Sequence, residues 1–310
     1  MRQAGVLDVG CHSALLTVVR AAPGAGLEPV FSRKVRLRLH RTLDDAGRLD
    51  DAGVRSVERA VARTRPDASV FAFATSVIRD APNRDEVIGR VAQATGTRLS
   101  VLSGEEEARL AYVAARRWAG PGTGPLLVLD IGGGTVEVAA GAAARPDRAL
   151  SLPLGARRVT RDRLIRGSGK NLSPARSHLR RALASVPELP AAGPGVRVLA
   201  CSKTFEQLAA LAAADVPGAD PRVLTRAGLH AAVRLLARTP LAQRGGLPGI
   251  SRHRAGQSLA GALVAEALME ACGAEAAEIC PWSTREGLLL ERLALSRPAA
   301  GAYREGPGRG

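Results

Sequence analysis

The stretch VLDVGCHSALLTVV at residues 6–19 has a near copy, VLDIGGGTVEVAAG, at residues 128–141. Each copy contains an apolar run, an aspartate, a glycine-containing turn and a second apolar run, which is the pattern of two strands joined by a tight turn. The aspartates, Asp8 and Asp130, lie 122 positions apart. Because strand and helix patterns follow each copy in a similar order, we expect an internal duplication of two α/β halves.

The composition supports two α/β domains. The chain has 310 residues, of which 46% are hydrophobic and only 3% aromatic, so the cores must be built from aliphatic side chains. The Gly/Pro-rich stretch AGPGTGP at 119–125 separates the two halves and is typical of a linker. We therefore predict an N-terminal domain over 1–123, a C-terminal domain over 124–295 and a disordered tail over 296–310.

The charge indicates a polyanionic partner. Lys and Arg total 44 against 29 Asp and Glu, a net charge of +15, which suits nucleic acid, acidic lipid or a phosphate polymer. The densest block, 155–181, carries nine basic residues and one acid. It contains no aromatic side chain for base stacking, which argues against single-stranded nucleic acid. A solvated, arginine-rich helical face is the alternative interpretation of this block.

The other sequence signals predict a cytoplasmic protein. The four cysteines form no C-x-x-C pair, so disulfide frameworks and metal fingers are not expected. No apolar run approaches the ~18 residues of a membrane helix. Asp8 interrupts the first apolar run, which argues against a signal peptide.

The segment DIGGGTVE, residues 130–137, suits phosphate and a hard cation. Three successive glycines let backbone N–H groups approach an anion, because no Cβ intervenes. Asp130 and Glu137 at its two ends are oxygen ligands of the kind that Mg²⁺ takes. A plain glycine hairpin with incidental acids is the alternative.

Four more segments place charged or polar residues where a strand ends. Glu105, Glu106 and Glu107 open a helix, where they either offset the helix dipole or supply a general base. Arg79 and Arg285 follow strands and suit phosphate, although such arginines are often surface residues. Ser202, Lys203 and Thr204 begin a helix, and helix N-termini bind anions. On these grounds we expect phosphate contacts from Gly132, Gly133, Gly134, Thr135, Ser202, Lys203 and Thr204. We expect the same of Gly10, Cys11, His12 and Ser13 if the first hairpin is a second copy of the phosphate-binding turn.

In order along the chain, the segments DVGCHS, FATSVIRDAPN, VLSGEEEARL, VLDIGGGTVE, SLPLGARRVT, SKTFEQLA, RAGQSLAGALV and CPWSTREG resemble the exopolyphosphatase/guanosine pentaphosphatase (Ppx/GppA) phosphatase family. SKTF and CPW resemble its short, two-domain actinobacterial members. The resemblance covers about residues 6–293. It implies the actin/hexokinase-like fold, with two RNase H-like domains flanking an active-site cleft. It also implies Mg²⁺-dependent hydrolysis of a terminal phosphoanhydride in polyphosphate or guanosine pentaphosphate, with a homodimer as the suggested assembly.

The resemblance assigns roles to individual residues. Glu107 matches the base that activates water, and Asp130 and Glu137 match the Mg²⁺ carboxylates. Asp8, at the equivalent position of the first hairpin, is the third metal ligand that we expect. Gly132, Gly133 and Gly134 match the phosphate loop, Arg79 and Arg285 match the phosphate clamps, and Lys34 and Arg36 match the entry for a polyanion.

The first hairpin departs from the family pattern. The family usually has Ser and Asn where this chain has Cys11 and His12, and a basic residue where it has Leu15. Those substitutions leave two other functions open, a weakly active enzyme and a non-catalytic sensor of polyphosphate or an alarmone. A sugar-kinase-like ATPase is a further alternative, disfavoured by the three glutamates and by the lack of an evident adenosine pocket. The final motif, STREG, replaces a commoner ALREG, a change we expect to matter little because the arginine is kept.

Overall fold

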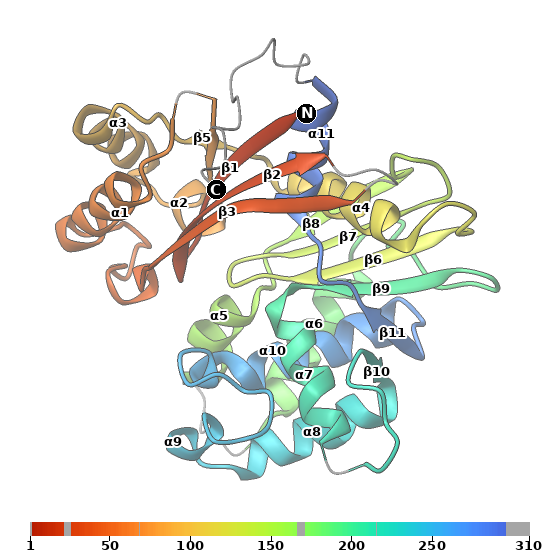
Figure 1. Ribbon diagram of the computed structural model, residues 1–310. Helices are drawn as coiled ribbons and strands as arrows, with labels where there is room; N and C mark the ends of the chain where they lie inside the picture. Colours follow the sequence, from red (N-terminus) through yellow and green to blue (C-terminus); the bar gives the residue numbers. More distant parts are fainter. Residues whose placement is uncertain (1, 22–25, 68, 166–170, 215, 296–310) are drawn as a thin grey trace, which may run out of the picture. The chain divides into compact units, whose positions relative to one another are not determined.

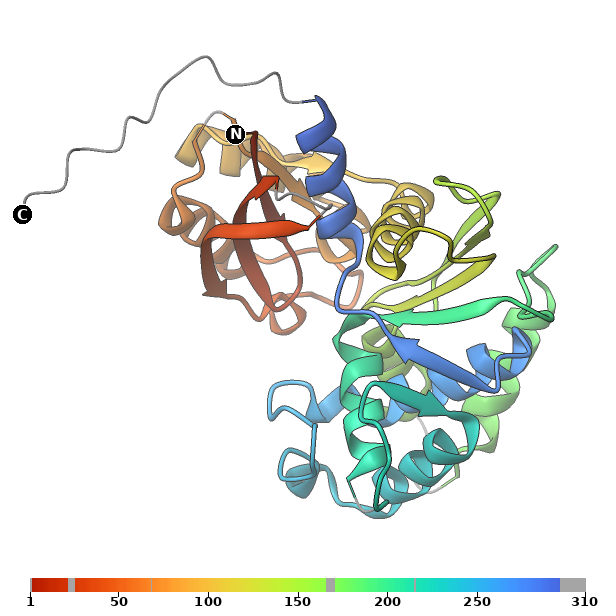
Figure 2. The same ribbon diagram turned by 45° about the vertical axis from the view of Figure 1, so that its right-hand side comes forward.

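The computed structural model describes residues 2–21, 26–67, 69–165, 171–214 and 216–295. The chain forms two compact units (Figures 1 and 2). The first contains the chain up to Val101 together with the described residues from Leu288, and the second contains Leu102–Gly287. No helix of the described chain is long and apolar enough to cross a membrane.

The first unit is built on a five-stranded sheet with the order β3-β2-β1-β4-β5. β1 is antiparallel to β2 and parallel to β4, and β2 is antiparallel to β3. The strands are β1 (Gln3–Val9), β2 (Ser13–Ala21), β3 (Leu27–Arg36), β4 (Phe71–Ala74) and β5 (Ser100–Val101). The helices are η2 (Leu39–Arg41), α1 (Asp51–Thr64), α2 (Ser76–Arg79) and α3 (Arg84–Thr95).

The second unit has a six-stranded sheet with the order β10-β11-β9-β6-β7-β8. Its strands are β6 (Leu126–Ile131), β7 (Val136–Gly141), β8 (Arg148–Leu152), β9 (Arg197–Cys201), β10 (Val223–Thr225) and β11 (Ala276–Ile279). Its helical segments are α4 (Gly104–Ala119), α5 (Ala156–Val159), η3 (Thr160–Ile165), α6 (Ser173–Ala184), α7 (Ser202–Ala213), α8 (Arg226–Arg238), α9 (Leu241–Arg244) and α10 (Ala255–Ala271). A last helix, α11 (Thr284–Leu295), begins in this unit and ends in the first.

The two sheets repeat one topology. In the second sheet, β7 is antiparallel to both of its neighbours, β8 and β6. The next two strands, β9 and β11, run parallel to β6. This is the order and direction of β3 to β5 in the first sheet, with β10 added at the edge. The predicted duplication and the predicted α/β class are therefore confirmed.

Successive side chains of β6 point to opposite faces of the second sheet, and both faces are covered. Leu126 and Val128 face a core shared with α4, whereas Leu127, Leu129 and Ile131 face a core shared with the helices on the other side. Figure 1 shows α4 on one side of this sheet and α7 and α10 on the other. A strand buried on both faces reads as a continuous apolar run, as β6 does.

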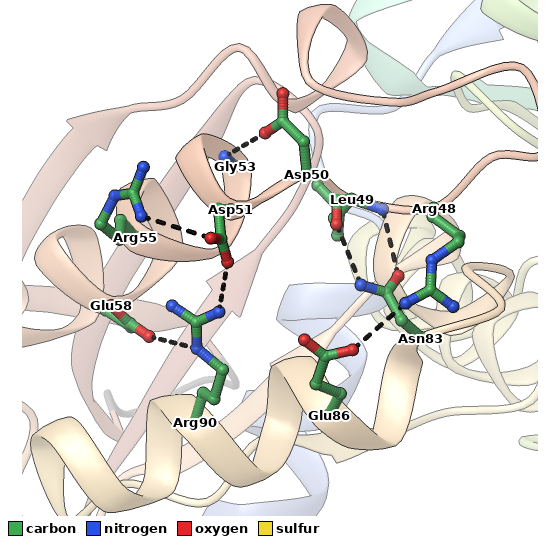
Figure 3. Close-up of polar contacts among 10 residues, drawn as sticks. All are labelled: Arg48, Leu49, Asp50, Asp51, Gly53, Arg55, Glu58, Asn83, Glu86 and Arg90. Carbon is green, nitrogen blue, oxygen red and sulfur yellow. Dashed lines mark hydrogen bonds and ion pairs between the residues drawn. The ribbon is translucent and has the colours of Figure 1, made fainter.

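Polar contacts join α1 to α3 in the first unit (Figure 3). Arg90 of α3 donates to Asp51 at 2.7 Å and to Glu58 at 3.1 Å, both on α1. The buried Asn83 accepts from the N–H of Leu49 at 3.1 Å and donates to its carbonyl at 2.9 Å. Ion pairs that are exposed or only partly buried contribute little, so the buried and hydrogen-bonded amide of Asn83 is the stronger anchor for the start of α3.

The division into units differs from the predicted boundary at 123/124. Helix α4 lies in the second unit, because its buried face, including Ala108, Ala111 and Tyr112, packs on the β6–β7 sheet. The Gly/Pro stretch at 119–125 is therefore a loop between α4 and β6 inside that unit. The predicted tail over 296–310 lies outside the described residues.

The described part of the basic block at 155–181 forms α5, η3 and the start of α6. Two of its arginines are used within the unit: Arg176 pairs with Glu266 at 2.9 Å, and Arg180 pairs with Glu270 at 3.1 Å. Both acids lie on α10, so these pairs join α6 to α10. The Arg176–Glu266 pair is half-buried, whereas the Arg180–Glu270 pair is exposed and agrees with a solvated helical face for this part of the block. Residues 166–170 of the block lie outside the described residues.

Candidate active site

The turn of the second hairpin brings two carboxylates together. Asp130, near the end of β6, lies directly opposite Glu137 of β7 in the antiparallel ladder. The N–H of Gly132 donates to the carbonyl of Thr135 at 2.9 Å and closes the turn. Directly opposed residues project from the same face of a sheet, so the register places both acids on one face.

The start of α5 holds the glycine turn in place. The N–H groups of 155–158 donate to the carbonyls of Gly132, Gly133 and Gly134 at 2.9–3.1 Å. Gly155 permits this approach, because a Cβ there would lie 2.4 Å from the carbonyl carbon of Gly134. Since these carbonyls accept from α5 and the N–H of Gly132 closes the turn, an anion would be bound here by the N–H groups of Gly133 and Gly134.

The carboxylates of Asp130 and Glu137 are buried, and both have raised pKa values. Burial, together with the charges of Asp130 and Glu107, raises the pKa of Glu137 to about 8, while hydrogen bonds from Thr135 and Ser151 lower it in part. Ser151 donates to Glu137 at 2.9 Å. Burial also raises the pKa of Asp130 to about 6. Two buried acids with raised pKa values, side by side, are typical of a functional site.

The structure distinguishes the three glutamates that open α4. Glu105 is exposed, Glu106 is bound by Arg109 through two 2.7 Å hydrogen bonds, and Glu107 is buried. Ser103 caps the helix by accepting from the N–H of Glu106 at 3.1 Å. Since the charge of Glu107 raises the pKa of Glu137, Glu107 is the one of the three that lies beside the paired acids.

The STREG segment at the start of α11 contacts both groups of acids. The Ser283 hydroxyl donates to Asp130, and the Thr284 hydroxyl donates to the backbone carbonyl of Glu107 at 3.2 Å. Gly287 lies so close to α4 that a Cβ there would be 2.1 Å from the Leu110 carbonyl oxygen. We expected the change from ALREG to STREG to matter little, but the hydroxyl groups of Ser283 and Thr284 make contacts that Ala and Leu could not make.

Arg285 lies in the same segment, with its guanidinium on a neighbouring acid. Its Nε donates to Glu286 at 2.9 Å, and its Nη2 donates to the same oxygen. Glu286 is buried, and its other carboxylate oxygen accepts from the N–H of Ser283 at 3.0 Å. Glu286 therefore ties Arg285 to the residue that contacts Asp130.

The predicted residues at the start of α7 have partners inside the unit. Thr204 donates to the carbonyl of Ile131 at 2.9 Å, and the Ser202 hydroxyl accepts from the N–H of Ile131 at 3.4 Å. Lys203 pairs with Glu206 at 2.5 Å. Ser202 has a φ of 80°, a conformation that costs a non-glycine residue energy. These hydroxyls fix the end of β6 beside the glycine turn.

The first unit holds the remaining predicted residues. In the first hairpin Gly10 donates to Ser13 at 2.9 Å, as Gly132 does to Thr135, and Asp8 lies opposite Leu15. Neighbouring strand β3 places Lys34 opposite Leu15 and Arg36 opposite Ser13. Both basic side chains are exposed.

Arg79 follows strand β4 but lies in a short helix rather than in a loop. It ends the short helix α2, and its Nε donates to Asp80 at 3.0 Å. Thr75, just before α2, donates its N–H to the carbonyl of Val9 at 3.2 Å. The first unit therefore brings the start of α2 next to the first turn.

Residues 17–296 match the Ppx/GppA phosphatase family. The chain belongs to this family. It is 43% identical over 302 residues to exopolyphosphatase 1 of Mycobacterium tuberculosis, a match that covers 93% of this chain and 88% of the relative. It is 41% identical to exopolyphosphatase 1 of Mycobacterium leprae, over 93% of this chain and 89% of that protein.

Solved structures of the family share the fold. The crystal structure of the Aquifex aeolicus Ppx/GppA member superposes with a TM-score of 0.78 at 24% identity, covering 96% of this chain and 99% of that one. An exopolyphosphatase from Cytophaga hutchinsonii gives a TM-score of 0.76 at 18% identity, with 96% and 99% covered. These likenesses confirm the predicted fold.

Proposed function

We propose that this member of the phosphatase family removes terminal phosphate from inorganic polyphosphate and releases orthophosphate in an Mg²⁺-dependent reaction. The observation that carries the proposal is the group of three buried acids, Glu107, Asp130 and Glu137, beside a braced glycine turn. The 43% identity to an exopolyphosphatase over most of both chains supports polyphosphate as the substrate.

The donor set fits a hard divalent cation. Asp130 and Glu137 offer carboxylate oxygens, the ligands that Mg²⁺ prefers. Burial is the largest cause of the raised pKa of Glu137, and the charges of Asp130 and Glu107 raise this pKa further. A cation held by Asp130 and Glu137 would offset this repulsion, and Mg²⁺ there would supply charge neutralisation for the phosphoryl oxygens.

The chain's own residues take the remaining roles in the proposed reaction. Glu107 accepts a proton from the attacking water and orients it toward the terminal phosphorus. The amide groups of Gly133 and Gly134 bind phosphate oxygens, and the hydrogen bonds from α5 keep these groups in place before the substrate arrives. Arg285 binds phosphate through its guanidinium group, for which it must exchange one of its bonds to Glu286.

The basic edge of the first unit supports a polyanionic substrate. Lys34 and Arg36 lie two residues apart on β3 and are both exposed, so they project from the same face of the strand. Together with the net charge of +15, they would raise the rate at which a long polyanion is captured, and added salt would weaken the effect. Asp8 and Arg79 keep the metal-binding and phosphate-binding roles that we expect from the sequence.

Guanosine pentaphosphate is a second candidate substrate. The chain is 33% identical over 155 residues to a guanosine-5'-triphosphate,3'-diphosphate pyrophosphatase of Pseudoalteromonas atlantica, which covers 48% of this chain and 30% of that protein. The shorter match makes this the weaker candidate. Both substrates end in a phosphoanhydride, so the same three acids would serve either reaction.

The test is phosphate release from polyphosphate, guanosine pentaphosphate and ATP, with and without Mg²⁺. We expect polyphosphate to be the best substrate, and Glu107→Gln to lower its turnover by about 10²–10⁴-fold. Glu105→Gln is the matched control, because Glu105 opens the same helix but is exposed, and it should leave the rate unchanged. Tight polyphosphate binding without release from any substrate would overturn the proposal and favour a sensor.

A further inference from the structure

A group of soft donor atoms lies at the first hairpin. Among the residues that the structure describes, Cys11, His12 and His40 form the one group of three potential ligand side chains whose donor atoms all lie within 4.8 Å of one another. Cys11 and His12 belong to the turn after β1, and His40 lies in η2, 29 residues after Cys11. All three side chains are half-buried, so an ion can reach them from solvent.

Backbone hydrogen bonds hold the two segments together. Leu37 donates its N–H to the carbonyl of His12 at 2.8 Å, and Leu39 donates to the carbonyl of Cys11 at 3.0 Å. Both leucines are buried in the core of the first unit. The placement of the three side chains therefore comes from the sheet and its core, which is the preorganisation that a metal site requires.

The distances are close to those of a tetrahedral metal site. Cys11 Sγ lies 3.8 Å from His40 Nδ1, and the rings of His12 and His40 have centroids 5.2 Å apart and planes tilted by 54°. Zinc–sulfur bonds of about 2.3 Å and zinc–nitrogen bonds of about 2.0 Å at a tetrahedral angle separate the two donors by about 3.5 Å. Cys11 Sγ and His40 Nδ1 therefore need to approach by only about 0.3 Å. The other donor pairs, all within 4.8 Å, need to approach by at most about 1.5 Å, which side-chain rotation can provide.

We propose that Cys11, His12 and His40 bind one Zn²⁺ ion, with a fourth position open to water or another oxygen ligand. A thiolate and two imidazoles are the donors of many zinc sites, and three protein ligands with one open position are the arrangement of catalytic and exchangeable ones. Such donors select zinc over magnesium, which takes oxygen ligands.

The bound ion would change the charge of the first turn. Zn²⁺ with one thiolate and two neutral imidazoles carries a net charge of +1, next to the exposed Lys34 and Arg36 strand. The ion would also join the β1–β2 turn to η2, in addition to the two backbone hydrogen bonds. The first turn would then bind a different class of metal from the second.

The experiment uses the full chain, stripped with a chelator and titrated with Zn²⁺ in excess Mg²⁺ without any phosphate compound. We expect one equivalent of Zn²⁺ to bind, with a rise in melting temperature. Co²⁺ in place of Zn²⁺ should give the intense visible bands of a tetrahedral site and a thiolate-to-cobalt charge-transfer band in the near ultraviolet. Cys11→Ser should remove the charge-transfer band and weaken Zn²⁺ binding by at least about 100-fold.

His40→Asn should weaken Zn²⁺ binding as much as Cys11→Ser does. The matched control is His178→Asn, which changes another half-buried histidine, on α6, and should retain both the affinity and the spectrum. Circular dichroism confirms that each variant is folded before it is titrated. Equal Zn²⁺ affinity in wild type and Cys11→Ser, or a Co²⁺ spectrum without the charge-transfer band, would overturn the proposal. The readouts do not involve phosphate release, so their failure leaves the proposed hydrolysis untouched.

Discussion

The two hairpins share a backbone but carry different chemistry. In both, a glycine N–H closes the turn at 2.9 Å, and N–H groups that follow the third strand brace the turn carbonyls. Both hairpins have an aspartate before the turn, but the residue opposite it is Leu15 in the first hairpin and Glu137 in the second. The turns hold Cys11 and His12 in one case and glycines in the other. The duplicated fold thus preserves the frame, while the side chains decide which metal and which anion each turn suits.

The paired positions Glu137 and Leu15 give the sharpest test of this difference. Glu137→Gln should lower polyphosphate hydrolysis by about 10²–10³-fold, because it removes a charged ligand that acts on the transferred phosphoryl group. Leu15→Gln places the same side chain at the equivalent position and should change the rate by less than about threefold. Steady-state rates at saturating Mg²⁺ measure both. Similar losses in the two variants would mean that the hairpins share the chemistry equally.

Gly155→Ala tests whether the brace from α5 is needed. The new Cβ would lie 2.4 Å from Gly134, so the turn must move, and we expect turnover to fall by about 10- to 100-fold and unfolding free energy by about 2 kcal/mol. Gly89→Ala is the control: it lies exposed in α3 with no atom within 4 Å of the new Cβ, and should stabilise by about 0.5–1 kcal/mol. A fully active Gly155→Ala enzyme would show that the turn needs no brace.

The burial of Glu137 predicts a pH dependence of stability in the metal-free protein. Its pKa is raised from 4.5 to about 8, so the folded state binds this proton more tightly than the unfolded state. The free energy of unfolding should therefore fall as pH rises from about 4.5 through about 8, by roughly 2–4 kcal/mol. Denaturant unfolding across this range measures the slope.

Glu137→Gln should flatten that slope, and Glu105→Gln, which changes an exposed acid, should leave it as in wild type. Saturating Mg²⁺ should also reduce the loss at high pH, because the cation stabilises the ionised acids. A metal-free wild type that is equally stable across the range would contradict the assigned burial of Glu137.

The smallest expected effect is a gain. Cys11→Ser, His12→Asn and Leu15→Arg together give the first turn the hydroxyl, amide and cation that the family pattern has there. With Mg²⁺ as the only added metal, we expect this triple variant to hydrolyse polyphosphate a few-fold faster than wild type, because it adds phosphate contacts. An unchanged rate would show that the first turn contributes little to hydrolysis as it stands.

The sequence predicted the duplicated frame well, because its evidence was local. Each hairpin is recognisable from an apolar run, an Asp-x-Gly turn and another apolar run, and the repeat of this pattern indicated the duplication. The boundary was harder, since a Gly/Pro loop after α4 looks the same whether it joins two domains or lies within one. Only the packing of α4 on the β6–β7 sheet decides between them.

Contacts between distant segments could not be predicted from the sequence. The orientation of α4 buries Glu107 and exposes Glu105, but the sequence of three adjacent glutamates does not indicate which of them faces the protein interior. The contact of Ser283 with Asp130 spans 153 residues, and that of His40 with Cys11 spans 29. No rule of sequence spacing connects such residues. Because the chain has no C-x-x-C pair, we did not expect the group of Cys11, His12 and His40.

The central claim is that Glu137 of the second hairpin binds the hard cation of the reaction, whereas Cys11 and His12 of the first turn do not. Mn²⁺, a paramagnetic substitute for Mg²⁺ that also takes oxygen ligands, can be titrated into the metal-free protein and the free ion followed by electron paramagnetic resonance. Wild type and the Cys11→Ser/His12→Asn variant should each bind Mn²⁺ with the same affinity, and Glu137→Gln should bind it at least about 10-fold more weakly. Unchanged Mn²⁺ binding in Glu137→Gln, or its loss in the first-hairpin variant, would contradict the claim.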